Sequence, residues 1–79
     1  MTRIKIYTGP RCPSCKMLKE KLKNHKNANL ILWCDVSNPT HNADAIMDEV
    51  FMLPTGIVEG TTKKLIGIND IIHAVDSLN

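Results

Sequence analysis

The sequence predicts a small α/β domain with its strands and helices in the order β-α-β-α-β-β-α. The first half of the chain shows a strand pattern, an amphipathic helical pattern and a second strand pattern. The second half shows another helical pattern, two short strand patterns separated by a glycine turn, and a last helical pattern. Strands joined through a helix pair in parallel, and strands joined by a tight turn pair antiparallel, so a mixed sheet is expected.

Length and composition limit the classes of protein that are possible. We expect one domain over residues 1–79, because a chain this short buries only roughly 60% of the surface that it exposes when unfolded. Hydrophobic residues make up 43% and charged residues 23%, which is typical of a folded globular protein. The net charge of +2 and the lack of a long apolar run predict neither a nucleic-acid partner nor membrane association. Three cysteines, an odd number, fit a reducing compartment, so we expect a cytoplasmic protein.

The first three elements follow from hydrophobic spacing. Residues 3–8 (RIKIYT) alternate as a strand does, and Gly9-Pro10 ends the pattern. From Pro13 to about residue 25 apolar positions recur at helical spacing. Residues 30–36 (LILWCDV) are nearly all apolar, which predicts a strand covered on both faces. The outer face of the predicted helix carries a basic stripe of Lys16, Lys19, Lys23 and Lys26.

The second half of the chain predicts a helix, a hairpin and a final helix. Pro39 favours the first helical position, with Ser37 or Asn38 as the cap, and Pro54 is expected to end this helix. Residues 55–59 and 62–66 should pair around a turn at Gly60-Thr61. Asn69 or Asp70 is expected to cap the last helix. The residues expected to face inward are Ala43, Ile46, Met47, Val50 and Phe51 in the first of these helices and Ile71, Ile72, Val75 and Leu78 in the last, and Met17, Met47 and Met52 are expected to fill the core.

Cys12 and Cys15 are the residues on which a chemical function can be predicted. In a helix that begins at Pro13, Cys12 is the N-cap, and the backbone N–H of Cys15 points at its side chain. The helix N-terminus, with Arg11 and Lys16 beside it, favours a thiolate, so the pKa of Cys12 should be lowered. One helical turn also brings the two Cα atoms within the roughly 4.4 to 6.8 Å that a disulfide requires. Cys12 would then attack a substrate disulfide, and Cys15 would resolve the mixed disulfide.

A metal site is the alternative for two cysteines at this spacing. A structural zinc ion needs four ligands, and Cys34 with His25 or His41 could supply the others. However, Cys34 lies inside an expected strand and no second Cys-x-x-Cys exists, so redox chemistry is favoured and Cys34 is expected to be a buried, inactive residue. A nonenzymatic module that binds zinc or an iron–sulfur cluster through Cys12 and Cys15 is the second hypothesis.

The chain contains, in order, the strings IYTGPRCPSCKMLKEKL, WCDV, LPTGIV and GIND. With these strings it resembles, over nearly its whole length, the glutaredoxins and the glutaredoxin-like hydrogen donors of ribonucleotide reductase, within the thioredoxin superfamily. The resemblance implies a thioredoxin-like fold, in which a four-stranded mixed sheet is flanked by three helices. It also implies that Cys12 is the nucleophile, Cys15 the resolving cysteine, and the bond before Pro54 cis. The Leu53 backbone would then face the two cysteines and pair with a bound peptide or glutathione.

The same resemblance implies the activity and its partners. It implies a monomeric dithiol oxidoreductase of electron transport and cell redox homeostasis, with no bound cofactor. Its substrates would be protein disulfides or glutathione mixed disulfides, and its electrons would come from glutathione or from a flavin-dependent reductase such as thioredoxin reductase. The implied substrate-binding residues are Arg11, Pro13, Ser14, Leu53, Pro54, Gly67 and Asp70.

Four positions depart from the patterns of these families. Gly9 stands three residues before the first cysteine, where glutaredoxins usually carry Lys or Arg, and Arg11 is the expected substitute. Ser14 replaces a Tyr between the cysteines, and Ile68 follows Gly67 where glutaredoxins have a second Gly. Thioredoxins carry a buried carboxylate six residues before the first cysteine, and Ile6 stands there in this chain.

Overall fold

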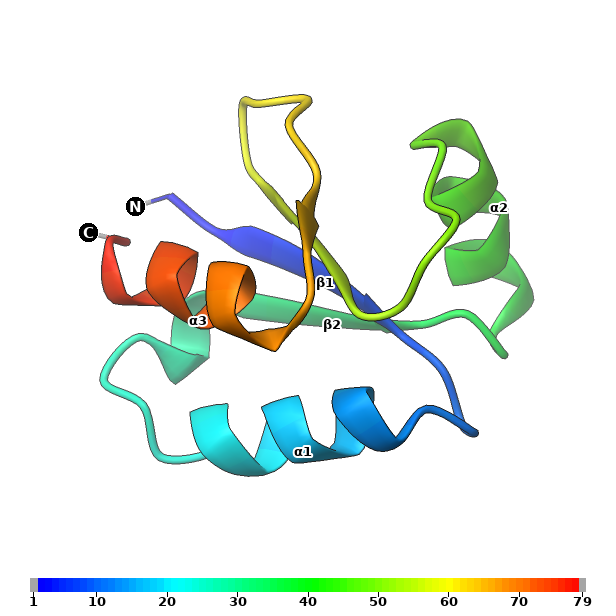
Figure 1. Ribbon diagram of the computed structural model, residues 1–79. Coiled ribbons are helices and arrows are strands. Elements are labelled where there is room, and N and C mark those ends of the chain that lie inside the picture. The colour runs from blue at the N-terminus through cyan, green and yellow to red at the C-terminus, as the bar shows by residue number, and fades with distance from the viewer. Residues whose placement is uncertain (1, 79) are drawn as a thin grey trace.

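A computed structural model describes residues 2–78, and its elements follow the predicted order. The α/β class, with a four-stranded mixed sheet and three helices, is confirmed (Figure 1). No helix within these residues is long and apolar enough to cross a membrane. The elements are β1 (Ile4–Thr8), α1 (Pro13–Leu22), the short 3-10 helix η1 (Ala28–Leu30), β2 (Ile31–Asp35), α2 (Pro39–Met47), β3 (Thr55–Val58), β4 (Leu65–Ile66) and α3 (Ile68–Asp76).

The sheet has the strand order β2-β1-β3-β4. β1 and β2 are parallel, with Thr8 opposite Asp35 at their carboxyl ends. β1 and β3 are antiparallel, with Tyr7 opposite Thr55, and β3 pairs antiparallel with β4. The carboxyl end of β1 therefore lies beside the end of β2 and the start of β3, and the chain leaves this end of the sheet to enter α1.

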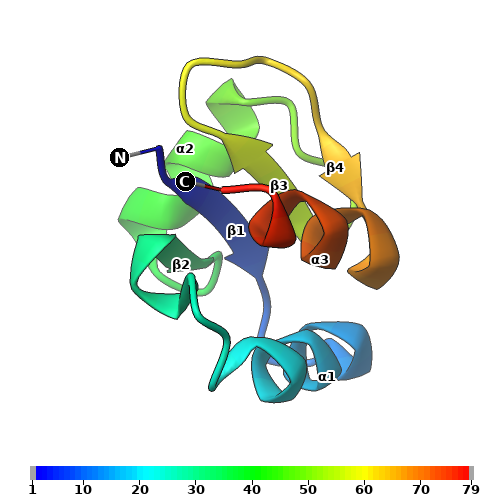
Figure 2. The ribbon, with the colours of Figure 1, turned by 90° about the vertical axis from the view of Figure 1, so that its left-hand side faces the viewer.

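The helices cover the two faces of the sheet unequally. α1 and α3 lie on one face and α2 on the other, as the edge-on view shows (Figure 2). Because side chains alternate along a strand, β1 supplies both layers: Ile4 and Ile6 face α1 and α3, and Tyr7 faces α2. The larger core contains Ile4, Ile6, Leu18, Leu22, Leu30, Ile71, Val75 and Leu78, and the smaller one contains Tyr7, Cys34, Ala45 and Ile57.

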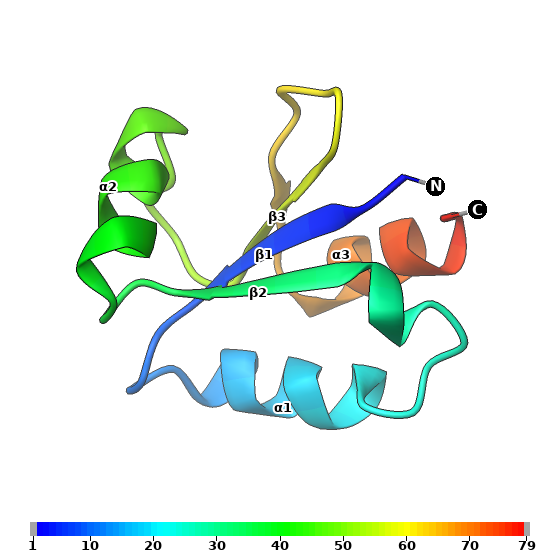
Figure 3. The same cartoon turned by 180° about the vertical axis from the view of Figure 1, so that it is seen from behind.

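β2 corrects the prediction of a strand covered on both faces. It is one of the two edge strands and runs between α1 and α2 in the view from behind (Figure 3). Leu32 is 49% exposed, because α2 covers only part of its face of the sheet. An open cavity of about 350 Å³ has Leu32, Lys5 and Ile57 among its lining residues. The apolar run of residues 30–36 therefore predicted a strand correctly, but the expectation that both faces of this strand are covered was wrong.

α2 is shorter and less buried than predicted. It starts as expected, with Asn38 as the cap and Pro39 first, but ends at Met47 instead of reaching Pro54. The chain turns at Glu49, whose φ is +57°, and the N–H of Val50 returns to the carbonyl of Ala45. Ala45 is the buried residue of the helix, and Val50 packs against the smaller core. Five of the residues expected to face inward or fill the core after Pro39 are exposed instead: Ala43, Ile46, Met47, Phe51 and Met52.

Smaller differences occur at three other boundaries. α1 ends at Leu22 rather than near residue 25, because the His25 N–H bonds to the Leu22 carbonyl in a turn. Met17 on α1 is exposed rather than in the core. The hairpin turns where expected, but Thr61 bonds to Val58 through both its N–H and its hydroxyl, and the returning strand is only Leu65–Ile66. Gly67, not Asn69 or Asp70, is the N-cap of α3; Ile71, Val75 and Leu78 are buried as predicted, and Ile72 is partly buried.

Candidate active site

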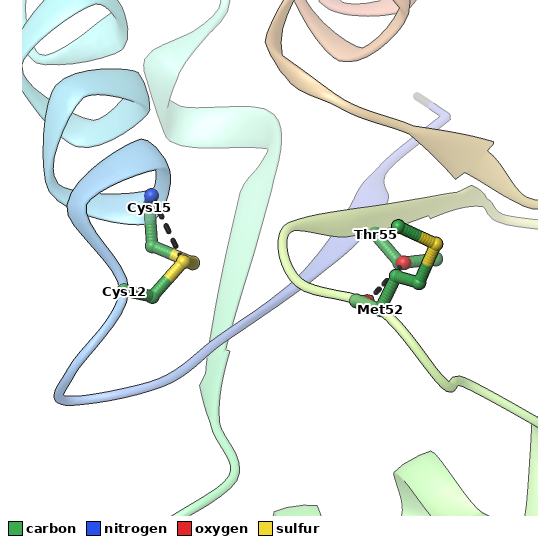
Figure 4. The surroundings of a disulfide bond; sticks show 4 residues. All are labelled: Cys12, Cys15, Met52 and Thr55. Carbon is green, nitrogen blue, oxygen red and sulfur yellow. Dashed lines mark hydrogen bonds between the residues drawn. A yellow bond between two sulfur atoms is a disulfide. The ribbon is translucent and has the colours of Figure 1, made fainter.

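Cys12 is the N-cap of α1, as the sequence predicted. Its backbone is extended (φ −123°, ψ 97°), and Pro13 occupies the first helical position. The backbone N–H of Cys15 donates to Cys12 Sγ at 3.2 Å (Figure 4). The Lys16 N–H donates to the Cys12 carbonyl at 3.1 Å, which closes the first turn. The sulfur of Cys12 thus lies where the unpaired amides of the helix start favour an anion.

The two cysteines form a disulfide, and they differ in access to solvent. Their Cα atoms are 5.2 Å apart, inside the range that a disulfide tolerates. Cys15 is 1% exposed, whereas Cys12 is partly exposed at the end of the helix. A molecule that approaches from outside therefore reaches Cys12 first.

The disulfide lines an open cavity of about 670 Å³ with a positive rim. Arg11, Lys16 and Lys19 supply three cations, and Asp35 at the end of β2 supplies one carboxylate. The Ser37 N–H donates to Asp35 Oδ1 at 2.8 Å and holds the pKa of that carboxyl below its ordinary value. The mouth of the cavity therefore carries a net positive charge, which suits an anionic substrate group.

The loop before β3 lies across from the disulfide (Figure 4). Its Leu53-Pro54 bond is cis, as the resemblance implied. The Thr55 hydroxyl donates to the Met52 carbonyl at 2.5 Å, and the Gly67 N–H donates to the Pro54 carbonyl at 3.3 Å. Within residues 2–78, no hydrogen bond uses the backbone amide or carbonyl of Leu53. Both groups are free to pair with an extended substrate.

Gly9 has a packing role beside this loop. A Cβ built at Gly9 would lie 2.9 Å from Leu53 Cδ1, so any side chain there displaces Leu53. The segment that leads into Cys12 and the loop that carries Pro54 are therefore in close contact.

The predicted site residues fall into two groups. Arg11, Cys12, Pro13 and Cys15 line the cavity, and Ser14 is exposed on α1 outside its lining. Leu53 and Pro54 lie on the opposite loop, with Gly67 bonded to that loop and Asp70 exposed in the first turn of α3. Sequence reasoning did not include Lys19 and Asp35 in the site. Their places, one turn after Lys16 and at the carboxyl end of a parallel strand, are signals that could have found them.

A hydrogen-bonded group on the α2 face was also not foreseen. Asp48 Oδ2 accepts from Lys5 Nζ at 2.8 Å and from the Tyr7 hydroxyl at 2.6 Å. Burial, and next the bond to Asp48, raise the pKa of Tyr7 to about 12. The bonds from Lys5 and Tyr7 lower the pKa of Asp48, and Asp48 raises that of Lys5. This group ties the start of the 48–54 loop to β1.

Cys34 is buried in the smaller core, as predicted, and burial raises the pKa of its thiol. It lies on the α2 face of the sheet, and the cavity beside Cys12 and Cys15 is lined by other residues. Across residues 2–78, no group of three or more His, Cys, Asp or Glu side chains is arranged to hold a metal ion.

The architecture is the thioredoxin fold. It is similar to mitochondrial thioredoxin 3 from Saccharomyces cerevisiae in its oxidized form, with a TM-score of 0.77 and 22% identity, over 98% of this chain and 78% of that one. It is also similar to a thioredoxin from Thermus thermophilus, with a TM-score of 0.69 and 13% identity, over 95% of this chain and 71% of that one. No protein-family model and no curated protein matches the sequence. The fold that the resemblance implied is thus confirmed.

Proposed function

We propose that this protein is a dithiol thiol-disulfide oxidoreductase. The observation that carries the proposal is the disulfide between the N-cap residue of α1 and the buried Cys15 one turn later, with the Cys15 N–H on Cys12 Sγ. A sulfur at a helix N-terminus ionises more readily than a free thiol. We therefore expect the pKa of Cys12 in the reduced protein to lie below about 8.5.

The reaction follows from the difference in access. The Cys12 thiolate attacks one sulfur of a substrate disulfide, a mixed disulfide forms, and the first substrate thiolate leaves. Cys15, buried one turn behind, then attacks Cys12 Sγ, so that the Cys12–Cys15 bond forms and the second substrate thiolate leaves. The substrate gains two electrons and the protein loses them. An external reductant then reduces the Cys12–Cys15 disulfide of the protein back to the dithiol.

The cavity supports two substrate classes within this activity, protein disulfides and glutathione mixed disulfides. Arg11 and its neighbouring lysines offer charge to a carboxylate, Pro13 and Ser14 form the exposed start of the helix, and the free Leu53 backbone offers strand-like pairing. Gly67 and Asp70, at the start of α3, would contact the part of the substrate beyond Pro54. We propose a monomer in a reducing compartment such as the cytoplasm, with ribonucleotide reductase among its possible acceptors and glutathione or a flavin-dependent reductase as its electron source.

A turnover assay tests this function. The wild type, Cys12→Ser and Cys15→Ser are compared on a protein disulfide, with glutathione plus its reductase in one series and thioredoxin reductase in the other. We expect turnover by the wild type in at least one series and none by Cys12→Ser. Cys15→Ser should accumulate a mixed disulfide at Cys12, which mass spectrometry locates. Turnover by Cys12→Ser, or a trapped adduct on Cys34, would contradict the assignment.

Metal analysis tests the competing hypothesis. Protein purified without oxygen should contain less than stoichiometric zinc or iron, and Cys12→Ser should not change that content. Stoichiometric metal that is lost on Cys12→Ser would instead assign Cys12 and Cys15 to a metal-binding module.

A further inference from the structure

Thr8 holds a buried hydroxyl without a hydrogen-bond partner. It is the last residue of β1 and is 0% exposed, and its Oγ1 finds no partner within residues 2–78. Thr55, the other fully buried threonine, donates its hydroxyl to the Met52 carbonyl. Buried hydroxyl groups in folded proteins are almost always paired, so the unpaired one at Thr8 calls for an explanation.

The alternation along β1 places Thr8 beneath α1. Ile4, Ile6 and Thr8 share the face that α1 and α3 cover. The chain reverses between Thr8 and Pro13, so α1 runs back along β1. Leu18 and Leu22 of α1 pack with Ile4 and Ile6 in the larger core, and Cys15, one turn nearer the start of the helix, is also buried. Three- and four-residue steps on a helix, about 4.5 to 6 Å, match two-residue steps on a strand, about 6.6 Å. From this match of spacings we infer that Leu22 lies over Ile4, Leu18 over Ile6, and Cys15 over Thr8.

The sheet register independently places Thr8 beside the site. Thr8 is paired with Asp35, which lines the cavity together with Cys15. On its other side, the pair of Tyr7 with Thr55 puts Thr8 next to the position of Pro54. Within the sheet, Thr8 is therefore flanked by Asp35, which lines the cavity, and by the position of Pro54 on the cis-proline loop.

We propose that the Thr8 hydroxyl donates a hydrogen bond to the sulfur of Cys15 when the Cys12–Cys15 disulfide is open, and so stabilises the reduced protein. The inference rests on the redox function proposed above. In the disulfide form the Cys15 sulfur is bonded to Cys12, and Thr8 has no partner. Reduction converts that sulfur into a thiol or thiolate, which is a better acceptor, at the place where the unused donor lies.

Thr8 is neither a base nor an electron carrier in this account. In the resolving step the Cys15 thiol gives its proton to water or buffer. The resulting thiolate attacks Cys12 Sγ, the Cys12–Cys15 bond forms, and the bond from Cys12 to the substrate sulfur breaks. The released substrate thiolate takes a proton from solvent. Thr8 keeps its own proton and loses its acceptor when the disulfide closes.

The charged groups near Cys15 lie on the solvent side of the pair. Arg11, Lys16, Lys19 and Asp35 line the cavity with the cysteines, whereas Thr8 approaches from the buried strand. On the sheet face that Cys15 covers, β1 contributes Ile4, Ile6 and Thr8, none of which is charged. Thr8 is thus the polar side chain that β1 supplies to Cys15.

The decisive measurement is the equilibrium of wild type and Thr8→Val with a thiol-disulfide redox buffer. Valine has nearly the same shape as threonine but lacks the hydroxyl. The dithiol form therefore loses the proposed hydrogen bond, and the equilibrium shifts toward the disulfide form. We expect the equilibrium constant for disulfide formation to rise about fivefold, which corresponds to a reduction potential about 20 mV more negative. An unchanged potential, or a shift to a less negative one, would overturn the proposal.

Stability measurements separate this role from a merely structural one. Oxidised Thr8→Val should be at least as stable to heat as the oxidised wild type, and reduced Thr8→Val should be less stable than the reduced wild type. A loss of stability that is equal in both redox forms would overturn the proposal. Thr55→Val is the matched control, because its hydroxyl already has an acceptor in the disulfide form; it should lower the stability of both forms alike.

A second pair of variants covers the case in which valine does not pack. Thr8→Ser and Thr8→Ala both lack the methyl group, and only serine keeps the hydroxyl. The potential of Thr8→Ser should stay near that of the wild type, and that of Thr8→Ala should shift as for valine; equal potentials for both would overturn the proposal. These readouts do not require turnover, so an inactive protein whose disulfide still opens and closes would count against the proposed function and leave the test of Thr8 intact.

Discussion

Asp48→Ala should destabilise the protein by about 2 kcal/mol, because one buried donor loses its acceptor. The Tyr7 side chain is fully buried, and its hydroxyl donates to Asp48 at 2.6 Å. A buried donor that is left unpaired costs about 1 to 3 kcal/mol. The Lys5 ammonium can turn to water, since its side chain is 39% exposed, so loss of the ion pair adds only about 0.2 to 1 kcal/mol. For a domain of this size, 2 kcal/mol corresponds to a decrease of about 8 to 16 °C in Tm.

Urea unfolding of the oxidised protein in a double-mutant cycle isolates this effect. The cycle compares wild type, Asp48→Ala, Tyr7→Phe and the double variant. With Tyr7→Phe in place there is no phenol to leave unpaired, so Asp48→Ala should then cost less than about 1 kcal/mol. The coupling between the two residues should be about 1 to 2 kcal/mol. A cost that is the same in both backgrounds, or below about 0.5 kcal/mol in the wild type, would show that the Tyr7 hydroxyl does not depend on Asp48 as its acceptor.

Three further predictions concern single residues. Tyr7 is the only tyrosine, and its pKa of about 12 in the folded protein exceeds the unfolded value of about 10. Its contribution to the free energy of unfolding should therefore be complete below about pH 10 and lost as the pH rises toward 12. A titration midpoint near pH 10 in the ultraviolet absorbance of the folded protein would contradict this. Cys34, whose pKa is raised by burial, should be alkylated slowly in the folded reduced protein and quickly in urea, and Cys34→Ala should keep full turnover; rapid labelling of the folded protein would show otherwise. Gly9→Ala should push Leu53 aside and lower the free energy of unfolding by about 1 kcal/mol. It should also raise KM for a disulfide substrate more than it lowers kcat, whereas an unchanged KM would show that the Leu53 loop does not contact the substrate.

Features that depend on neighbours in sequence could be predicted. The alternation in β1, the Asn38 cap before Pro39 and the Cys12 cap before Pro13 each involve residues within one helical turn or one strand. The chemistry of the cysteine pair followed for the same reason, because a cap residue and the third residue of the helix meet whatever surrounds them.

Features that depend on the tertiary structure could not be predicted from the local sequence. The apolar residues Ile46, Met47 and Phe51 recur at helical spacing, yet the chain turns at Glu49 and leaves them exposed. The run around Leu32 indicates a strand, but nothing local tells that this strand is at the edge of the sheet.

Polar contacts between residues far apart in the chain could not be predicted from sequence patterns either. Asp48 bonds to Lys5 across 43 positions, and neither residue belongs to a motif. The sequence predicts only that Thr8 is a polar residue at the end of a strand. The structure is needed to show that its hydroxyl is buried and has no hydrogen-bond partner within residues 2–78.

The proposed function depends on the start of α1, which should make Cys12 an acidic, outward-facing thiol. The most direct test is the pH dependence of its alkylation in the fully reduced protein, with mass spectrometry to identify the modified cysteine. Cys12 should be labelled first, with an apparent pKa below the value of about 8.5 for a free cysteine. A value at or above that of free cysteine, or faster labelling of Cys15, would contradict it.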